Sequence, residues 1–350
     1  MLPVFSNVQL TNNRTNVETF GISPYLQFPV FSFAQSELRY SYTELNYDAV
    51  SVRDSMVEQI NFFVRSNQNS SRLRWTMNYD NQLIDYKDTT NDFIREAIGL
   101  DLNYRTTPSF AVVGLIGYED IEYVDVINAP NISDSYWGLG FSWDITGRTN
   151  LELRAGERYD DNTYYGRFAS RTRNSIWELI YLEDLTTAAN QQLSRVSVSQ
   201  AESAADTPDS ELTNNDQGAA SLLSEPFLEK RLSFSYRYNL RGNGILINAY
   251  SLERSYQLSS EIQKDSGSRI RIDWQVLSRT RLSFLGRYQN RFFEQTNRTI
   301  ISRQIGIRAT RELSTYASGF LQYRNIRANF VEAGTSNVEN IIEATIELTF

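Results

Sequence analysis

Cysteine and histidine are both absent from the 350 residues. Without cysteine there is no disulfide framework, no thiolate metal site and no thiol nucleophile. Without histidine, Ser–His catalysis, Cys–His catalysis and imidazole metal ligation are excluded together. No suitably spaced pair of carboxylates replaces them. We therefore expect a protein that is not an enzyme and that holds no metal and no cofactor.

Lysine is nearly missing. The 34 basic residues include only Lys87, Lys230 and Lys264, so the rest are arginine. The formal net charge is −8. A protein that binds nucleic acid needs a basic surface to neutralise phosphates, so this balance argues against nucleic acid as a partner.

Long apolar runs are missing as well. No run approaches the 18 or so residues that a membrane-spanning helix needs. The mean hydropathy of −0.44 is typical of a soluble protein. Membrane β-barrels share such averages because only alternate residues face lipid. No basic and then apolar leader precedes Pro3. If the chain is a secreted barrel, we expect the numbering to start after a leader.

The chain does contain segments of about ten to fourteen residues in which apolar and polar side chains alternate. Such alternation indicates strands with one apolar and one polar face. The cleanest is 229–241, and 280–293 is similar. Segments 109–122, 174–185 and 243–256 alternate poorly, so their faces are uncertain. In 229–241 one face carries Leu232, Phe234, Tyr236, Tyr238 and Leu240, and the other carries Arg231, Ser233, Ser235, Arg237 and Asn239.

Short and long connections alternate between these segments. Short turns lie near 106–108, 146–148, 241–243 and 278–280. Longer connections lie at 83–91, 123–134, 186–228, 257–267 and 327–338. Barrels of the outer membrane have short turns at one rim and longer loops at the other. We predict eighteen strands, with sixteen as the alternative, and both termini on the short-turn side. The strands are 2–10, 17–28 (interrupted by Pro24), 33–47, 55–66, 72–82, 92–105, 109–122, 135–145, 149–159, 163–173, 174–185, 229–241, 243–256, 268–277, 280–293, 298–310, 314–326 and 339–350.

Alternation alone also fits a soluble sandwich, propeller or β-helix. Two observations favour a membrane barrel: long arginines on the polar face, and aromatics near strand ends, which suit the girdles at the two membrane interfaces. No repeat of about 40 residues supports a propeller. We predict an all-β fold, a transmembrane antiparallel up-and-down β-barrel. It forms a single domain over 1–350, with a long outside or lumen-folded loop at 186–228.

The last strand ends on an aromatic residue. Ile342, Ala344, Ile346, Leu348 and Phe350 share one face. In outer-membrane barrels the last strand closes the barrel and carries the signal that the barrel assembly machinery reads. We assign Leu348 and Phe350 to such a signal, with an ordinary edge strand as the alternative.

Two stretches, 22–48 and 156–187, carry a resemblance. The matching features are Gly156-x-Arg158-Tyr159, Arg171-x-Arg173, and Trp177 with Tyr181. They resemble an uncharacterised outer-membrane β-barrel family associated with the PEP-CTERM/exosortase system in bacterial exopolysaccharide loci. The resemblance implies a bacterial outer-membrane location and a link to export of polysaccharide or surface protein. It brings no active site, and Thr345 departs from the glycine of many terminal barrel strands.

The polar face is rich in arginine. Arginine is always charged, and its rigid fork of donors suits carboxylates and phosphates. Residues on adjacent antiparallel strands lie within reach of each other across the ladder. We predict a pore wall that selects anionic or sugar-like solutes. The alternative is an internal network of Arg–Glu pairs that stiffens the barrel. The predicted pore-lining residues are Glu152, Arg154, Arg158, Arg167, Arg171, Arg231, Arg237, Arg281, Arg287 and Arg291.

Acidic segments have several interpretations. The 186–226 connection has one basic residue, Arg195, and no aromatic. It fits a disordered outer loop, a constriction folded into the lumen, or a contact for partners. We place the carboxylates Asp160-Asp161, Glu119-Asp120 and Asp85/Asp88 at loop positions. There they are solvated charge, or they bridge lipopolysaccharide through divalent ions.

Two functions from different classes remain. The first is passive passage of hydrophilic or anionic material across the bacterial outer membrane, linked to exopolysaccharide or surface-protein export. The second is a structural or scaffolding barrel with a closed lumen, whose loops bind a surface polymer or a partner protein. The expected partners are outer-membrane lipid and lipopolysaccharide, the barrel assembly machinery, and polysaccharide or export partners.

Overall fold

The computed structural model describes residues 17–47, 54–67, 72–87, 92–124, 132–159, 161–187, 190, 226–257, 259, 261–314 and 316–348. Within these ranges, no helix is long and apolar enough to cross a membrane. The described residues form eighteen β-strands. They are β1 (Val17–Ile22), β2 (Tyr25–Val30), β3 (Ala34–Tyr47), β4 (Ser55–Ser66), β5 (Leu73–Tyr86), β6 (Phe93–Thr107), β7 (Phe110–Tyr123), β8 (Ile132–Thr146), β9 (Thr149–Arg158), β10 (Asp161–Arg171), β11 (Ser175–Thr186), β12 (Phe227–Leu240), β13 (Asn243–Tyr256), β14 (Ile262–Leu277), β15 (Thr280–Phe293), β16 (Arg298–Ser314), β17 (Ala317–Phe330) and β18 (Thr335–Leu348).

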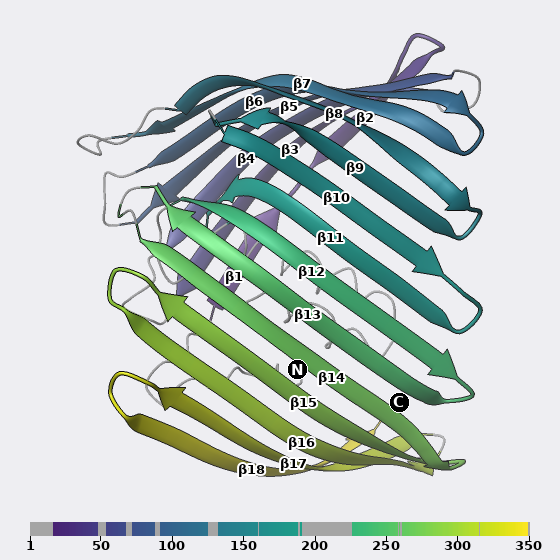
Figure 1. Ribbon diagram of the computed structural model, residues 1–350, viewed down its shortest axis with the longest axis vertical. Coiled ribbons are helices and arrows are strands. Elements are labelled where there is room, and N and C mark those ends of the chain that lie inside the picture. The colour runs from purple at the N-terminus through teal and green to yellow at the C-terminus, as the bar shows by residue number, and fades with distance from the viewer. Residues whose placement is uncertain are drawn as a thin grey trace.

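From β3 to β18, each strand pairs antiparallel with the next one along the chain. This order makes one long sheet that curls round on itself (Figure 1). The turns after β6, β8, β10, β12, β14 and β16 gather at one end, on the right in Figure 1. We call this end the short-turn rim and the opposite end the long-connection rim. The predicted all-β, antiparallel, up-and-down fold of eighteen strands is confirmed.

The first two strands are two halves of one crossing. Val17 lies opposite Tyr47, and Val30 lies opposite Ala34, so β1 and β2 follow one register along β3. The break falls at Ser23 and Pro24, as the sequence predicted for 17–28. The predicted strand 17–28 is thus counted as two strands, β1 and β2, so the eighteen strands are not the same eighteen that the sequence predicted. The predicted strand 2–10 lies outside the described residues.

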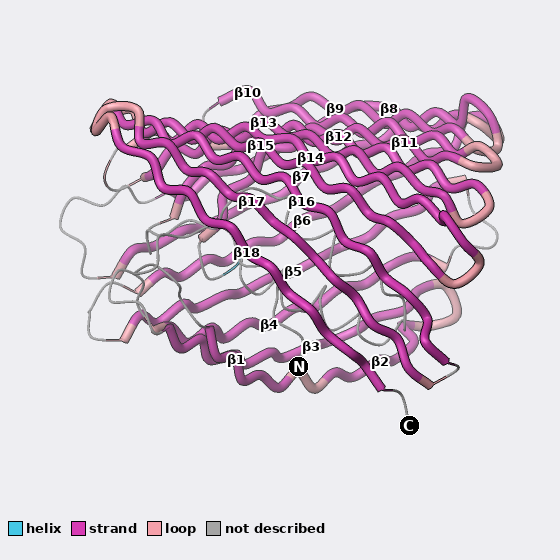
Figure 2. Tube along the Cα trace, turned by 90° about the horizontal axis from the view of Figure 1, so that it is seen from below, coloured by secondary structure: helices cyan, strands magenta, loops and turns pink. Residues whose placement is uncertain are grey.

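The curled sheet has two free edges. Among the described residues, no backbone pairing joins β18 to β1 or β2, so the sheet is not closed. The chain leaves β18 at the short-turn rim, where Leu348 lies opposite Ala317 (Figure 2). Phe350 lies outside the described residues. The proposed assembly signal at the chain end therefore stays a prediction.

Two predicted long connections are wrong. In the structure the connections expected at 257–267 and 327–338 are only 257–261 and 331–334, because the neighbouring strands are longer than predicted. β14 begins at Ile262 and β18 at Thr335. The first residues of both strands are mostly polar. They pair through the backbone with the neighbouring strands, so both strands extend beyond the segments in which apolar and polar residues alternate.

A small apolar core lies inside the sheet near the long-connection rim. Its buried side chains come from β3 to β7 and from β11. This cluster fills one side of the interior, where a water-lined wall would carry polar residues. Its members are Leu45, Val57, Ile84, Tyr86, Phe93, Ile121, Tyr123 and Leu185.

Candidate functional site: the arginine-rich inner face

One face of the sheet can be followed from strand to strand through the registers. Side chains alternate between faces along a strand, and paired residues share a face. Arg167 lies opposite Glu152, for example, and Arg287 lies opposite Arg269. Side chains of this face also meet across strands that are not neighbours, which only a concave face allows. All ten predicted pore-lining residues belong to this inner face.

The predicted group on β9 and β10 is only partly brought together. Arg154 Nε lies 3.2 Å from Glu152 Oε1. Arg167 lies opposite Glu152 but turns to β11, where its Nη2 lies 2.8 Å from Glu178 Oε1. The adjacent strands therefore bring the right residue types within reach, but the ion pairs do not follow the ladder.

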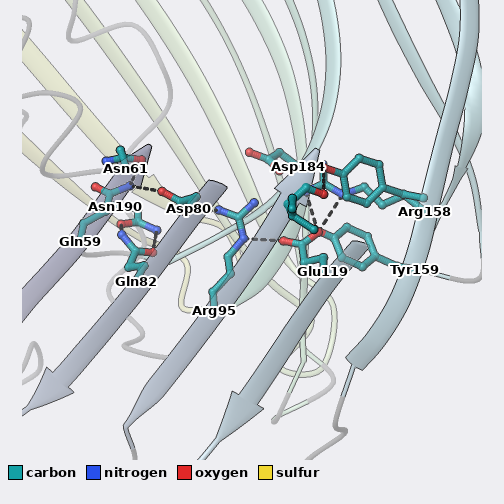
Figure 3. A network of polar contacts seen from close by, with 12 residues as sticks. Gln59, Asn61, Asp80, Gln82, Arg95, Glu119, Arg158, Tyr159, Asp184 and Asn190 are labelled. Atoms are coloured by element: carbon teal, nitrogen blue, oxygen red, sulfur yellow. Dashed lines mark hydrogen bonds and ion pairs between the residues drawn. The ribbon is translucent and has the colours of Figure 1, made fainter. Parts of the chain in front are cut away.

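Arg158 instead belongs to a cluster that sequence reasoning missed (Figure 3). Its centre is the Glu119 carboxylate, whose side chain is only 2% exposed. Arg158 Nη2 donates to Glu119 Oε2 at 2.8 Å, and the Tyr159 hydroxyl donates to the same oxygen at 3.0 Å. Arg95 Nε donates to the other oxygen. Arg158 Nη1 also lies 3.3 Å from Asp184 Oδ1. The cluster thus joins β6, β7, β9 and β11.

The assignment of Glu119 to a loop is wrong. It lies inside β7, four residues before the strand ends at Tyr123. Burial raises the pKa of the Tyr159 phenol, which lies in the turn after β9, well above its ordinary value. The phenol therefore stays protonated and donates to Glu119. A buried carboxylate holding two guanidinium groups and a hydroxyl is a structural junction.

Polar contacts continue from this cluster toward β4 and β5 (Figure 3). Arg95 Nη1 lies 3.5 Å from Asp80 Oδ1, and Gln59 donates to Asp80 at 2.7 Å. Gln82 and Asn190 exchange two amide hydrogen bonds of 2.7 and 2.8 Å. Asn190 follows β11 at the start of the long connection, whereas Gln82 is on β5. The described beginning of that connection therefore reaches across the inner face.

This amide pair gives a first prediction. Replacing Asn190 by leucine should lower the free energy of unfolding by about 1–3 kcal/mol, because Gln82 is 3% exposed and keeps no partner for its amide. Equilibrium urea unfolding in detergent measures the change. The double replacement Gln82→Leu/Asn190→Leu should recover much of the loss. Asn81→Leu, on the outer face of β5, is the control and should change stability by less than about 0.5 kcal/mol.

Glycines on β6 and β7 make room for an aromatic ring under this cluster. A Cβ on Gly117 would lie 2.3 Å from Cζ of Tyr136, and one on Gly99 would lie 2.7 Å from its hydroxyl oxygen. The phenol end of Tyr136 therefore occupies the space that a side chain on either glycine would take. The Arg158 guanidinium lies 5.1 Å from the centre of the same ring. Glycines at defined positions are one way in which a sheet takes up curvature.

A second cluster lies on β12 and β13. Glu229 takes Arg231 Nη2 at 2.5 Å and Arg254 Nε at 3.3 Å. Arg254 is completely buried, and its guanidinium lies 5.3 Å from the centre of the Phe227 ring. Because this ion pair is buried, it is not accessible to a solute in the lumen. We therefore interpret it as a contact that holds β12 and β13 together.

A third cluster lies on β13, β14 and β15 around Asp265, which is 2% exposed. Tyr250 donates to it at 3.1 Å, Gln289 at 2.9 Å, and Arg291 Nε lies 3.5 Å away. Arg287 lies on the same face, opposite Arg269. Arg291 therefore contacts a buried carboxylate of the wall.

Three of the predicted residues differ from the others. Arg171, Arg237 and Arg281 are exposed on the inner face, and within the described part of the chain they make no ion pair. Their guanidinium groups are available to a solute. Arg237 also borders a cavity of about 390 Å³ on β11, β12 and β13. Its other lining residues include Ile176, Glu178, Ile180, Ser233 and Asn248.

Charge is divided unevenly around the inner face. On β3 to β11 the registers place nine arginines and ten carboxylates inward, so this wall is nearly neutral. On β12 to β17 they place eleven arginines against Glu229, Asp265, Asp273 and Glu312. By the same register, β18 adds Glu339, Glu343 and Glu347. We call β12–β17 the arginine wall. Its arginines are Arg231, Arg237, Arg254, Arg269, Arg271, Arg281, Arg287, Arg291, Arg298, Arg308 and Arg324.

The carboxylates do not gather into a metal site. In the ranges that the structure describes, no group of three or more acidic side chains is placed to hold a metal ion. Asp85 and Asp120 lie in β5 and β7, and Asp161 begins β10, so their assignment to loops is wrong. Backbone pairing at the long-connection rim extends those strands through polar residues.

Comparison with known proteins shows the fold. No family model matches, and no curated protein matches. Among solved structures, the siderophore receptor PirA from Pseudomonas aeruginosa is similar at a TM-score of 0.50 and 9% identity, over 95% of this chain and 63% of that one. The fold is that of an outer-membrane β-barrel.

Two further structures match less well. The copper transporter OprC has a TM-score of 0.46 and 12% identity, over 89% of this chain and 59% of that one. The outer-membrane channel DcaP of Acinetobacter baumannii has a TM-score of 0.37 and 10% identity, over 92% and 99%. The chain thus spans about six tenths of the transporter and of the receptor. At these identities the likeness concerns the fold alone, and function rests on the inner face.

Proposed function

We propose that the protein is a barrel of the bacterial outer membrane that gives passive passage to hydrophilic, anionic solutes. The observation that carries this proposal is the arginine wall, with eleven arginines against four carboxylates. A wall of fixed positive charge raises the local concentration of anions and lowers that of cations. Within it, Arg237 and Arg281 are the residues we expect to touch the solute.

The outer face supports the location. It exposes large apolar side chains on most strands, among them Leu139 at 60%, Ile305 at 69% and Ile342 at 76%. Contiguous exposed apolar surface of this extent would be a liability in water, whereas a bilayer covers it. The inner face is polar apart from the small apolar core, and this distribution is the one that an outer-membrane barrel requires.

The experiment is ion conductance of the folded barrel in a planar bilayer. We expect a current with anions preferred over cations. The pair Arg237→Gln/Arg281→Gln should reduce the anion-to-cation permeability ratio severalfold, because it removes two exposed charges that form no ion pair with a carboxylate of the described residues. Arg303→Gln, on the outer face of β16, is the matched control and should leave the ratio unchanged.

Two results would contradict the proposal. If the correctly folded barrel carries no current, the proposal of passive passage is wrong. A current with equal anion and cation permeability keeps passage but removes selection by the arginine wall. Folding of each variant is checked by the shift in electrophoretic mobility between heated and unheated samples.

A specific observation supports the scaffolding alternative. Several inner side chains are almost completely buried, including Arg254 at 0%, Ile326 at 1% and Gln322 at 4%. Side chains that line a wide water-filled lumen remain exposed, so the lumen is narrow at these positions. A barrel that folds, conducts no ions and still binds a polysaccharide through its rims would favour this second function.

We further propose that the solute is an acidic polysaccharide segment, in line with the resemblance to barrels of exopolysaccharide loci. Arginine forks suit the carboxylates of uronic acids, and tyrosines and amides of the inner face suit sugar hydroxyls. Liposomes loaded with barrel should take up short uronic-acid oligomers faster than neutral oligomers of equal length. Equal rates would remove the polysaccharide part of the proposal.

A further inference from the structure

The short-turn rim is strongly basic. Nine arginines lie in its turns or at the strand ends beside them, and all nine are exposed. Three acidic residues share the described part of this rim: Asp144, Glu312 and Glu347. We call these arginines the basic rim. They are Arg72, Arg105, Arg148, Arg171, Arg173, Arg241, Arg279, Arg281 and Arg311.

None of the nine guanidinium groups makes an ion pair with a described carboxylate. At the long-connection rim the pattern is reversed. All three lysines lie there, and each pairs with a carboxylate: Lys87 with Glu44 at 2.7 Å, Lys230 with Asp161 at 3.8 Å, and Lys264 with Glu253 or Glu294 at 3.8 Å. The exposed arginines of the short-turn rim therefore lack the carboxylate partners that the lysines of the opposite rim have.

The basic rim borders the apolar outer face directly. Leu240 precedes Arg241, and Leu277 is two residues before Arg279. Leu240 is 42% exposed and Leu277 is 62% exposed. Leu313 and Tyr316, exposed by 52% and 70%, follow Arg311 in the same way. Ile145 and Trp177, exposed by 42% and 40%, lie near Arg148 and Arg173. Five of the arginines thus lie at the boundary between lipid-facing side chains and water, where phospholipid headgroups lie. These five are Arg148, Arg173, Arg241, Arg279 and Arg311.

We propose that the basic rim binds the phosphate groups of anionic phospholipids. Guanidinium groups offer paired donors that match phosphate oxygens, and arginines beside an anionic membrane surface are attracted to it. Barrels of this type place short turns on the periplasmic side, so the rim lies at the phospholipid leaflet. The apolar boundary favours a lipid over a soluble acidic protein, which would need no lipid-facing leucines beside its arginines.

The test uses the purified full chain in nanodiscs and spin-labelled lipids. Electron paramagnetic resonance measures the association of phosphatidylglycerol relative to phosphatidylcholine at the barrel surface. We expect roughly threefold preference for phosphatidylglycerol at low salt, falling toward one as sodium chloride approaches roughly 0.5 M. Replacing the five boundary arginines by glutamine should abolish the preference, and replacing them by lysine should retain most of it.

The control removes the same number of cations elsewhere: Lys87, Lys230, Lys264, Arg298 and Arg327 to glutamine. The preference should survive. The assignment of the lipid preference to the basic rim would be overturned if the control variant lost the preference for phosphatidylglycerol, or if the glutamine variant of the five boundary arginines kept it. Inorganic phosphate at matched ionic strength should act no more strongly than chloride. If phosphate weakens the lipid preference more than chloride does, the rim is a site for free phosphate. If polyglutamate binds more tightly than the lipid, the rim binds an acidic protein. Either result would replace the lipid proposal.

Discussion

Replacing Glu119 by glutamine is expected to lower the free energy of unfolding by about 3–5 kcal/mol. Glu119 is 2% exposed and holds Arg95, Arg158 and Tyr159. The neutral glutamine amide leaves the largely buried guanidinium groups of Arg95 and Arg158 without their main counter-charge. Its NH₂ group is also a donor and would face the donors of these two arginines. Breaking one partner of a buried pair costs more than the pair itself contributes.

Equilibrium urea unfolding in detergent measures this loss. Glu122→Gln removes an exposed carboxylate from the outer face of the same strand, and we expect it to change stability by less than about 0.5 kcal/mol. The double variant Glu119→Gln/Arg158→Met should be more stable than Glu119→Gln alone, because it removes one stranded charge. A loss below about 1 kcal/mol for Glu119→Gln would show that water or another carboxylate replaces it.

The second large effect is expected from Gly156→Ala. A Cβ at Gly156 would lie 1.9 Å from the carbonyl oxygen of Trp137 and 2.6 Å from the Cα of Gly138. These are backbone atoms of β8, so no side-chain rotation relieves the clash. The strands must separate locally, which should cost about 3 kcal/mol or more.

The residue directly opposite supplies the control. Gly138 pairs with Gly156, but a Cβ on Gly138 would meet its nearest atoms at 3.8 Å, an ordinary contact. Gly138→Ala should therefore cost less than about 1 kcal/mol. Amide hydrogen exchange on β8 and β9 should accelerate only in Gly156→Ala. Equal effects of the two substitutions would mean that β8 and β9 lie farther apart than the structure shows.

The fold could be predicted because most strands keep apolar and polar residues on separate faces. In 229–241 every lipid-facing position from Leu232 to Leu240 is apolar or aromatic, and most inner positions are arginine or serine, so the period is plain. It fails in β7, β11 and β13, where inner positions are apolar too. Ile121, Ile180 and Leu246 face inward there. A wall that is apolar on both sides has no period of two.

The partners in the site could not be predicted in the same way. The ladder correctly places Arg167 opposite Glu152, yet the side chain pairs with Glu178. Glu119 and Arg158 lie on strands two apart, and they meet because the sheet is curved. That curvature depends on small residues such as Gly117, over which Tyr136 lies. Such contacts across strands depend on shape in three dimensions, which periodicity along one strand does not encode.

The uneven charge of the inner face has a geometrical consequence. The neutral wall and the arginine wall lie on opposite sides of the curled sheet, so the electric field inside has a component across the barrel as well as along it. A negatively charged chain entering such a tube would be drawn off the axis and would slide along one side. The width available to it is then set by the height of the arginine side chains above β12 to β17.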